Sequence, residues 1–410
     1  MKTNSLLRPK LAIAFALAFA FLLFGLAPEM AFGALSCRGV FTNPDRAAVF
    51  GDINQEFKHE LKFDVEVPNQ SHVKDQCQLG TCHLQAWVSQ MEHDYQVRTG
   101  KKIELSTKYL SAYHWMMRAV QELVKKTPGV SIELGATQYD SRALILRAGV
   151  MPEGVWEPIV DFTSEPTATR LQGYLKNVIV RSKEAQAKAL NNAEVMAIQL
   201  ASQHEIAEIF NNVLGHVPEK FEFEGKLYNP EGFRAEQFPD LGGYLMTVTV
   251  QDNPRLKVAL QSDRSQAVIE GNINLVEKTA RALIDKGENV YLAYEHVSEY
   301  VDNASGVMSM KAFVQPPNSG PVSRLKRHAS GIAGGGHAVQ IVGYSLDPKT
   351  GRVAKWKIKN SWGEKAGHDG YYTMYRDYFR QFVRNISYYS TSKIQLPSKL
   401  EKRDSFDPAI

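Results

Sequence analysis

The order of its periodic segments is the feature that most constrains how this 410-residue chain can fold. In the first part of the chain, apolar residues recur every three or four positions, whereas towards the end apolar and polar residues alternate. The first spacing is typical of amphipathic helices and the second of half-buried strands. Helices that come first and strands that come last predict an α+β fold with segregated halves, not an alternating β/α fold.

The predicted elements are well separated along the chain. Helices are predicted at 82–98 before Gly100, 106–120, 138–146 before Gly149, throughout 165–215, and at 275–286 before Gly287. Strands are predicted at 290–294, 337–344, 353–358 and 371–375, and a small hairpin at 221–228 around Glu224-Gly225-Lys226. Between Asp302 and Gly336 the chain is rich in Pro and Gly, which indicates a long loop directly before His337. In the strand 353–358, alternation puts Lys355 and Lys357 on the face opposite Trp356.

The N-terminus has the pattern of a secretory signal peptide at residues 1–33. A basic start (Lys2, Arg8 and Lys10) precedes the apolar run 11–27, and Ala31-Phe32-Gly33 follows, which makes Ala34 the first mature residue. The alternative is an uncleaved membrane anchor, but the apolar run is only about 17 residues long, at the bottom of the spanning range. We therefore expect a periplasmic or extracellular protein with no stable membrane span after cleavage.

Charge and composition narrow the class of partner. The chain is 44% hydrophobic and 22% charged, a globular balance, and its formal net charge is +4. The signal segment contributes +2 of this, from Lys2, Arg8 and Lys10 against Glu29. The remainder is close to neutral, which leaves no electrostatic case for binding nucleic acid.

The three cysteines, Cys37, Cys77 and Cys82, cannot all pair within one chain. Cys77 either forms a disulfide with Cys37 or packs as a small apolar residue. Lipidation of Cys37 is a further alternative, but Ala34-Leu35-Ser36 is a poor lipidation signal because it lacks a large aliphatic residue three positions before the cysteine. The odd thiol therefore needs an explanation of its own.

Cysteine chemistry supplies that explanation. Cys82 follows Gly80-Thr81 at the start of a predicted helix, where the helix dipole favours a thiolate. His337 can supply an imidazolium, and Asn360 can fix its orientation. Gln76, six residues before Cys82, can pair its amide with the backbone N–H of Cys82 to stabilise an oxyanion. No His-Glu-x-x-His or paired-cysteine spacing is present, so we predict neither a metal nor an organic cofactor.

These segments resemble those of the papain-like cysteine peptidases. The family pattern is a Gln, a Cys six residues later, and then His-Ala-Val and Asn-Ser-Trp-Gly far downstream, which matches Gln76, Cys82, His337 and Asn360. Within that family the chain is similar to the bleomycin hydrolase and bacterial aminopeptidase C group over roughly 65–395. The segments that carry this similarity are Leu105–Leu110, Leu134–Tyr139 leading to Gly149–Pro152, Leu214–Phe221, Asp252–Pro254 and Lys355–Glu364 with Gly370-Tyr371.

The resemblance implies a papain-like two-lobe fold. A helical left lobe and a β-rich right lobe would enclose an active-site cleft within a peptidase domain at 34–395. His337 lies 255 residues after Cys82, whereas papain-like enzymes place it about 130–150 residues on. The helical segment at about 160–215 is the natural place for an insertion. In the aminopeptidase group the C-terminal arm enters the cleft and limits cleavage to N-termini, and residues 396–410 are the equivalent tail here.

The predicted function is hydrolysis of a peptide or protein substrate through a Cys82 acyl-enzyme, with trimming of N-terminal residues. The alternatives are an endopeptidase and a catalytically inactive binding or scaffold protein; a homo-oligomer is left open. The chain departs from the group in two ways: His83 replaces the usual aromatic residue after the nucleophile, and a signal segment precedes the domain although the group is typically cytosolic. Adjacent helical residues do not face each other, so we do not expect His83 to replace His337 as the base.

Overall fold

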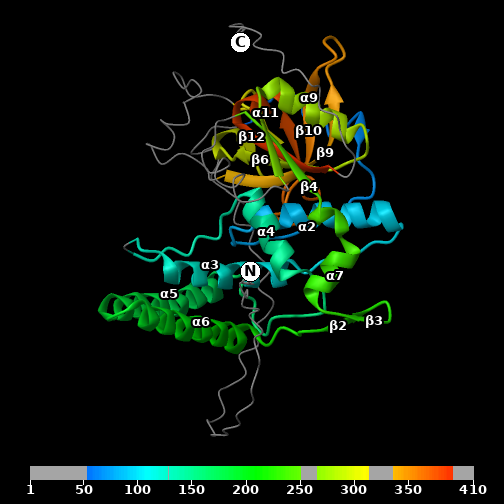
Figure 1. The fold of residues 1–410 in the computed structure, drawn as a ribbon. Helices are drawn as coiled ribbons and strands as arrows, with labels where there is room; N and C mark the ends of the chain where they lie inside the picture. Colours follow the sequence, from blue (N-terminus) through cyan, green and yellow to red (C-terminus); the bar gives the residue numbers. More distant parts are fainter. Residues whose placement is uncertain (1–52, 128, 251–265, 314–335, 391–410) are drawn as a thin grey trace, which may run out of the picture. The chain divides into compact units, whose positions relative to one another are not determined.

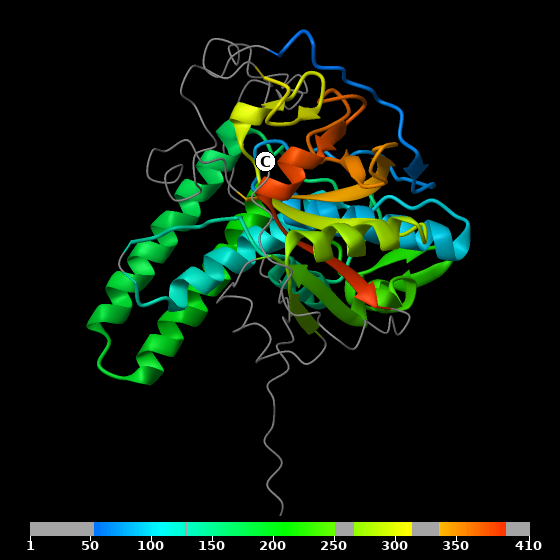
Figure 2. The same cartoon turned by 90° about the horizontal axis from the view of Figure 1, so that it is seen from above.

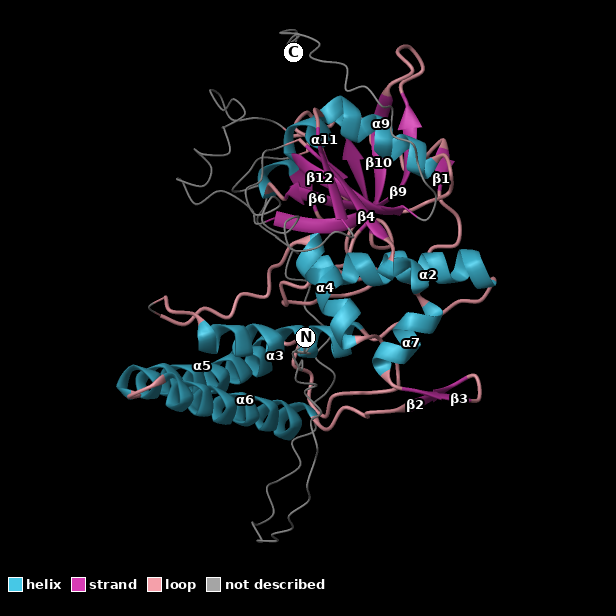
Figure 3. Cartoon of the chain, in the orientation of Figure 1, coloured by secondary structure: helices cyan, strands magenta, loops and turns pink. Residues whose placement is uncertain are grey.

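The computed structural model describes residues 53–127, 129–250, 266–313 and 336–390, all within one unit of the chain, Cys37–Ile410. The predicted signal at 1–33, most of the predicted loop and the tail at 396–410 lie outside the described residues. The described part is α+β, as predicted, with most helices gathered on one side of a large sheet (Figure 3). None of the described helices is both long enough and apolar enough to cross a lipid bilayer.

The predicted helices are present within a few residues of their expected bounds, and two short helices, at 230–237 and 376–382, were not predicted. They are α2 (Cys82–Thr99), α3 (Thr107–Val124), α4 (Gln138–Ala148), α5 (Glu165–Lys188), α6 (Asn192–Leu214), α7 (Pro230–Gln237), α9 (Ile273–Ile284) and α11 (Arg376–Phe382). Gly100 and Gly149 end α2 and α4 with φ values of 71° and 72°, which favour glycine. At Gly149 a Cβ would also lie only 2.1 Å from the backbone of Pro230, where α7 begins. The backbone of the Gly149–Pro152 motif therefore packs directly against the start of α7.

The strands of the main sheet come from both ends of the described chain. They are β1 (Val65–Glu66), β4 (Tyr244–Thr249), β5 (Gln266–Glu270), β6 (Val290–Glu295), β7 (Val301–Asp302), β8 (Val307–Met308), β9 (Gly336–Leu346), β10 (Val353–Lys359), β11 (Tyr371–Tyr375) and β12 (Val383–Ser390). Their order is β5-β4-β12-β6-β9-β10-β11-β8-β7, with β1 paired to β9. The separate hairpin of β2 (Phe221–Phe223) and β3 (Lys226–Tyr228) turns at Glu224 and Gly225, as predicted.

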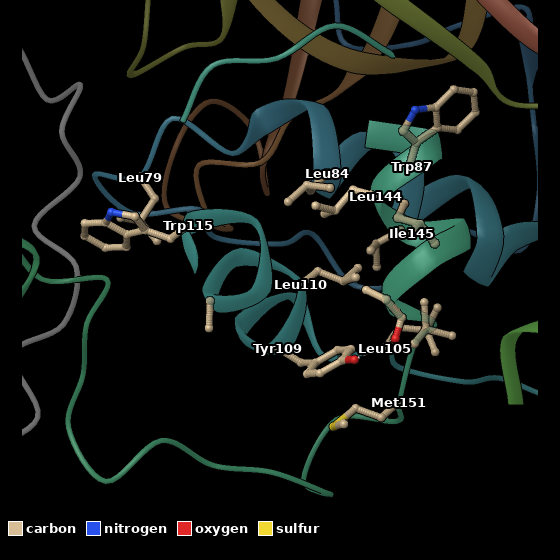
Figure 4. Close-up of a cluster of buried hydrophobic side chains, with 14 of the residues drawn as sticks. Leu79, Leu84, Trp87, Leu105, Tyr109, Leu110, Trp115, Leu144, Ile145 and Met151 are labelled. Atoms are coloured by element: carbon tan, nitrogen blue, oxygen red, sulfur yellow. Dashed lines mark hydrogen bonds between the residues drawn. The ribbon is translucent and has the colours of Figure 1, made fainter. Parts of the chain in front are cut away.

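The sheet separates two hydrophobic cores. Successive residues of β6 point to opposite faces: Tyr291 joins the core shared with α2, and Leu292 joins the core shared with α9 and α11. Figure 1 shows α2 between the sheet and the other helices of its lobe, and α9 and α11 on the far side of the sheet. In the helical lobe, side chains of α2, α3 and α4 converge, among them Leu84, Leu110 and Ile145 (Figure 4). The fold thus brings the start of α2 against β9.

The segment predicted to be helical at 165–215 is helical except for a three-residue break. The chain breaks at Ala189–Asn191 and forms the antiparallel pair α5 and α6, which extends away from the rest of the helical lobe (Figure 2). Asn191 causes the break because its side chain accepts a hydrogen bond from the Glu194 N–H at 3.0 Å and caps α6. The Glu194 carboxylate in turn accepts from the Leu190 N–H at 2.8 Å.

The lysine face of β10 is covered. Lys355 and Lys359 are only 6% and 2% exposed, because the extended segment 58–71 lies over them. Their ammonium groups donate to backbone carbonyls of that segment, Lys355 to Glu60 at 2.5 Å and Lys359 to Ser71 at 2.7 Å. Each buried charge therefore has polar partners, as burial requires.

Candidate active site

Cys82 is the first residue of α2 and the free cysteine among the described residues. Its side chain is half-buried. Burial raises the pKa of the thiol to about 11, and backbone N–H groups of Ala338, His83 and Cys82 itself act in the opposite direction. Two of these N–H groups belong to the first turn of α2, where the helix dipole favours negative charge. The third follows His337 directly, so the Cys82 sulfur lies beside the segment that carries this histidine.

His337 is fixed by a hydrogen bond and by aromatic rings. Its Nε2 lies 2.8 Å from Asn360 Oδ1, an oxygen that can only accept, so Nε2 carries the hydrogen and Nδ1 is the basic nitrogen of the neutral ring. Trp362 stacks on the ring at 4.6 Å, and Tyr294 meets it edge-on at 5.6 Å. Burial lowers the pKa of His337 to about 4, and the bond to Asn360 acts to raise it.

Asn360 and Gln76 are held by the same short bridge between distant segments. The Gly363 N–H donates to the Lys74 carbonyl at 3.0 Å, and the Gln76 N–H donates to the Ser361 carbonyl at 2.9 Å. The Ser361 N–H donates to Asn360 Oδ1 at 2.9 Å, next to the bond from His337. The orientation of the Asn360 amide is therefore fixed from two sides.

The Gln76 side chain is buried and its amide is also oriented. Ser361 Oγ donates to Gln76 Oε1 at 2.7 Å, and Gln76 Nε2 donates to the Leu79 carbonyl at 2.8 Å. An amide nitrogen has two hydrogens, so one remains for another acceptor. An oriented donor with one unused hydrogen is what an oxyanion hole requires.

A buried glutamine joins the two elements that carry Cys82 and His337. Gln340 of β9 is fully buried, and its Nε2 donates to the Ala86 carbonyl of α2 at 2.7 Å. On the same helix, Trp87 stacks on Tyr291 of β6 at 4.7 Å. The start of α2 is thus seated against β9 and β6 by one polar contact and one aromatic contact.

His83 lies in the interior of the helical lobe. Its Nε2 donates to the Leu134 carbonyl at 2.8 Å, and His114 donates to the same carbonyl at 2.9 Å. Burial lowers the pKa of His83 to about 3, so the ring is neutral, and its Nδ1 lies within hydrogen-bond distance of the Ser141 hydroxyl at 2.6 Å. Both ring nitrogens are occupied, which agrees with the expectation that His83 is not the base.

Cys77 is disulfide-bonded, and its partner lies outside the described residues. This selects one of the two readings that the sequence left open. Cys77 adopts φ of 50°, and its N–H donates to the Asp75 carboxylate at 2.8 Å. The bonded sulfur therefore sits in a tight turn next to Gln76, while the Cys82 thiol stays free.

Sequence reasoning missed a buried charge network beneath the site. Lys74 lies 2.7 Å from the Glu92 carboxylate and also pairs with Glu104. Burial lowers the pKa of Lys74, but the two carboxylates outweigh this effect and raise it. Glu92 also accepts from the Leu105 N–H at 2.8 Å. The network links the segment before Gln76 to the middle of α2, and no sequence motif marks it.

A second missed residue is His296, which follows β6. Its ring meets His337 edge-on at 6.0 Å and Trp362 at 5.1 Å. Burial, and then the charge of His337, lower the pKa of His296 to about 3. Two imidazoles this close disfavour each other's protonation. As for metals, no group of three or more His, Cys, Asp or Glu among the described residues is arranged to hold an ion.

Comparison with known proteins finds a matching family and several relatives named as aminopeptidases. The model of the Peptidase C1-like family matches residues 255–404. Aminopeptidase G of Lactobacillus delbrueckii subsp. lactis is 23% identical over 394 residues, which cover 85% of this chain and 86% of that one. Aminopeptidase W of the same organism is 26% identical over 233 residues, about half (52%) of each chain.

The fold has a counterpart among solved structures. The crystal structure of PepW from Lactobacillus rhamnosis HN001 superimposes with a TM-score of 0.61 at 19% identity, covering 84% of this chain and 83% of that one. The fold and the site segments together define a papain-like cysteine peptidase. Residues 255–404 match the Peptidase C1-like family, and the relatives of the chain include bacterial aminopeptidases and bleomycin hydrolase.

Proposed function

We propose that this chain hydrolyses peptide bonds through a Cys82 acyl-enzyme, with His337 as base and acid, Asn360 as the group that orients it, and Gln76 as an oxyanion donor. The observation that carries the proposal is the 2.8 Å bond from His337 Nε2 to Asn360. It leaves Nδ1 as the basic nitrogen on a residue whose neighbour, Ala338, donates to the Cys82 sulfur. A nucleophile, a base and an orienting group are thus present in the order that acyl transfer needs.

The reaction follows from these positions. His337 Nδ1 takes the Cys82 proton as the sulfur attacks the substrate carbonyl carbon. The oxygen becomes negative and accepts hydrogens from the Cys82 backbone N–H and from Gln76 Nε2. The His337 imidazolium then gives its proton to the leaving amine. Water, deprotonated by His337, hydrolyses the thioester and releases the acid.

Burial explains why the thiol and the imidazole change charge together. Each ionised form alone is disfavoured, which is why the pKa of Cys82 is raised and that of His337 is lowered. Proton transfer between them creates two opposite charges side by side, and each offsets the burial cost of the other. The Asn360 oxygen adds a partner for the imidazolium.

Covalent labelling of the full chain tests this proposal. Iodoacetamide should alkylate Cys82 stoichiometrically, with a rate that falls at least about tenfold in His337→Ala. Cys82→Ser should abolish both labelling and peptidase activity, while Cys77→Ser should keep a reactive thiol at position 82. A slow, His337-independent labelling of Cys82 without turnover would support the inactive scaffold instead.

We further propose that the enzyme trims N-termini, because most of the curated relatives reported above are named aminopeptidases. Deletion of Phe406–Ile410 in the tail should raise cleavage of amino-blocked peptides relative to free ones. Equal ratios for the truncated and full-length chains would favour an endopeptidase. As a control for intact folding, the truncated and full-length chains should cleave peptides with a free N-terminus at about the same rate.

We also propose export after cleavage before Ala34. The disulfide at Cys77 supports this, because disulfides persist in oxidising compartments. Since Cys82 is free and the sequence has three cysteines, Cys37 is the proposed partner of Cys77. Non-reducing peptide mapping of the purified protein tests the pairing and reads the N-terminus at the same time. An intact residue 1, or a lipid on Cys37, would overturn cleavage before Ala34.

A further inference from the structure

A cavity of about 400 Å³ opens between α9, α11 and the turn before β10, away from the candidate active site. Five of its lining side chains are cationic and one is anionic. They are Lys278, Arg281, Arg352, Arg376, Arg380 and Glu277. This balance contrasts with a chain whose formal charge is only +4 overall.

The local sequence explains how the fold gathers these charges. Lys278 and Arg281 are three residues apart on α9, so they lie on one face of the helix. Arg376 and Arg380 are four residues apart on α11 and share a face in the same way. Arg352 reaches the cavity from the turn that leads into β10. Three separate elements therefore present cations to one space.

The acidic groups within reach do not neutralise this cluster. The Glu277 carboxylate lies 3.6 Å from Arg376 and 3.4 Å from Arg380, so one negative charge is shared by two guanidinium groups. Arg376 Nε is shielded from solvent but has no hydrogen-bond partner among the described residues. Asp285 lies 3.9 Å from Arg281. In the described parts of the chain, the side chains of Lys278 and Arg352 make no ion pair.

Such a cluster is stabilised by an anion. Guanidinium groups match the oxygens of phosphate and carboxylate in pairs, and five cations against the carboxylates of Glu277 and Asp285 leave several donors for a ligand. The volume falls in the range of small-molecule sites, about 300–1,000 Å³, and exceeds what one tetrahedral anion needs. We propose that this cavity binds a small polyanion with two or more neighbouring oxyanion groups. Phosphates and carboxylates are the two sources of that chemistry.

This site is separate from the candidate active site. Val353 at the cavity and Lys359 beside Asn360 are the two ends of β10, about 20 Å apart at about 3.3 Å per residue. The proposal therefore does not depend on the proposed peptidase function, and binding can be measured in Cys82→Ser.

Calorimetric titration of the full chain at constant ionic strength tests the proposal. Tripolyphosphate or citrate should bind saturably at one site per chain, and the tighter of the two identifies the source of the oxyanions. Single inorganic phosphate should bind at least about tenfold more weakly, because it engages fewer of the cations. Absence of saturable binding by both polyanions would overturn the proposal.

Two variants and a matched control sharpen the test. Lys278→Gln with Arg352→Gln removes two exposed cations and should weaken binding of the tighter anion at least about tenfold. Lys176→Gln with Lys188→Gln makes the same change in charge on the exposed face of α5 and should leave binding within about twofold. Equal weakening in both pairs would mean a diffuse charge effect and would overturn the site.

Glu277→Gln provides a test of opposite sign. It removes the carboxylate that competes for Arg376 and Arg380, so binding should tighten by about threefold or more. Circular dichroism should confirm that the variant stays folded. A folded Glu277→Gln that binds the polyanion more weakly would contradict the proposed role of the two arginines.

Discussion

The surroundings of His83 and of His337 can be compared directly, because both are buried histidines whose pKa is lowered by burial. In the helical lobe, His83 has a partner at each ring nitrogen, the Leu134 carbonyl and the Ser141 hydroxyl. At the start of β9, the bond from His337 to Asn360 occupies only Nε2. The difference teaches that a histidine available for proton transfer is identified by the nitrogen that its surroundings leave basic, and not by its burial or pKa.

The largest expected effect comes from removing the histidine with the basic nitrogen. His337→Ala should lower kcat/KM for a peptide substrate by at least about 10³-fold, since it removes the general base. The thermal midpoint should also fall, because the buried ring packs against Trp362 and bonds Asn360, so kcat/KM is compared for the folded enzyme. Steady-state kinetics with a fluorogenic peptide provide the measurement. An activity within tenfold of the parent chain would break the distinction between the two histidines.

The next largest effect is expected from Gln76, whose oriented amide has one unused hydrogen. Gln76→Ala should lower kcat by about 10²–10³-fold, the usual cost of one oxyanion donor. Gln138→Ala is the matched control: this glutamine is equally buried, but its amide bonds Asn385 at 3.3 Å. The control should alter stability and leave kcat nearly unchanged. Similar losses of kcat in both variants would remove Gln76 from the oxyanion hole.

A smaller loss is expected where the partner of His337 is removed. Asn360→Ala should lower kcat/KM by about 10–100-fold, because it orients the ring and transfers no proton. The acid limb of the pH–rate profile should also move to lower pH, since the bond to Asn360 raises the pKa of His337. A reduced rate with an unmoved acid limb would show a structural role only.

His83 should affect stability far more than turnover. His83→Ala removes the hydrogen bonds to the Leu134 carbonyl and the Ser141 hydroxyl and leaves a cavity in the helical lobe, so the free energy of unfolding should fall by about 1–3 kcal/mol. Urea denaturation measures this loss. The kcat/KM of the folded fraction should stay within about threefold of the parent value; a loss as large as that of His337→Ala would make His83 part of the site.

His83 and His337 contribute to the pH dependence of stability in the same direction. The pKa of His83 in the folded chain is about 3 and that of His337 is about 4, both below the ordinary value of 6.5. Between each folded value and pH 6.5, the unfolded chain binds a proton that the folded chain does not. Stability is therefore present above about pH 6.5 and is lost as pH falls, by about 1.4 kcal/mol per pH unit for each histidine. His83→Gln and His337→Gln should each reduce that slope by about one proton. Urea midpoints between about pH 6.5 and pH 4 test this.

Much of the site could be predicted because it lies in segments with short-range signals. Gly80-Thr81 before an apolar 3–4 spacing marks the start of α2, and alternation after Gly336 marks β9. The bonds that orient Gln76 and Asn360 could not be predicted, since residues 74–77 and 360–363 meet only in the folded chain. The break before α6 could have been predicted, because Asn191 three residues before Glu194 is a helix-capping pattern. The spacing of apolar residues over 165–215 does not reveal it.

Other parts of the fold have no signal of their own. The segment 58–71 shows no periodicity because it follows the lysine face of β10, where it accepts hydrogen bonds through backbone carbonyls that any residue supplies. His296 is one histidine among eleven, and its contact with His337 arises only from the pairing of β6 with β9. Residues that act through backbone contacts or strand pairing leave no pattern in the sequence.

The bridge between residues 74–77 and 360–363 has a consequence for how the chain matures. It joins points more than 280 residues apart, so it carries a large loop-closure entropy and should be among the last contacts to form during folding. Until it forms, the Gln76 amide and the Asn360 amide have no fixed direction. A newly made chain would then carry a thiol but no assembled site, which delays self-digestion until the native topology is complete.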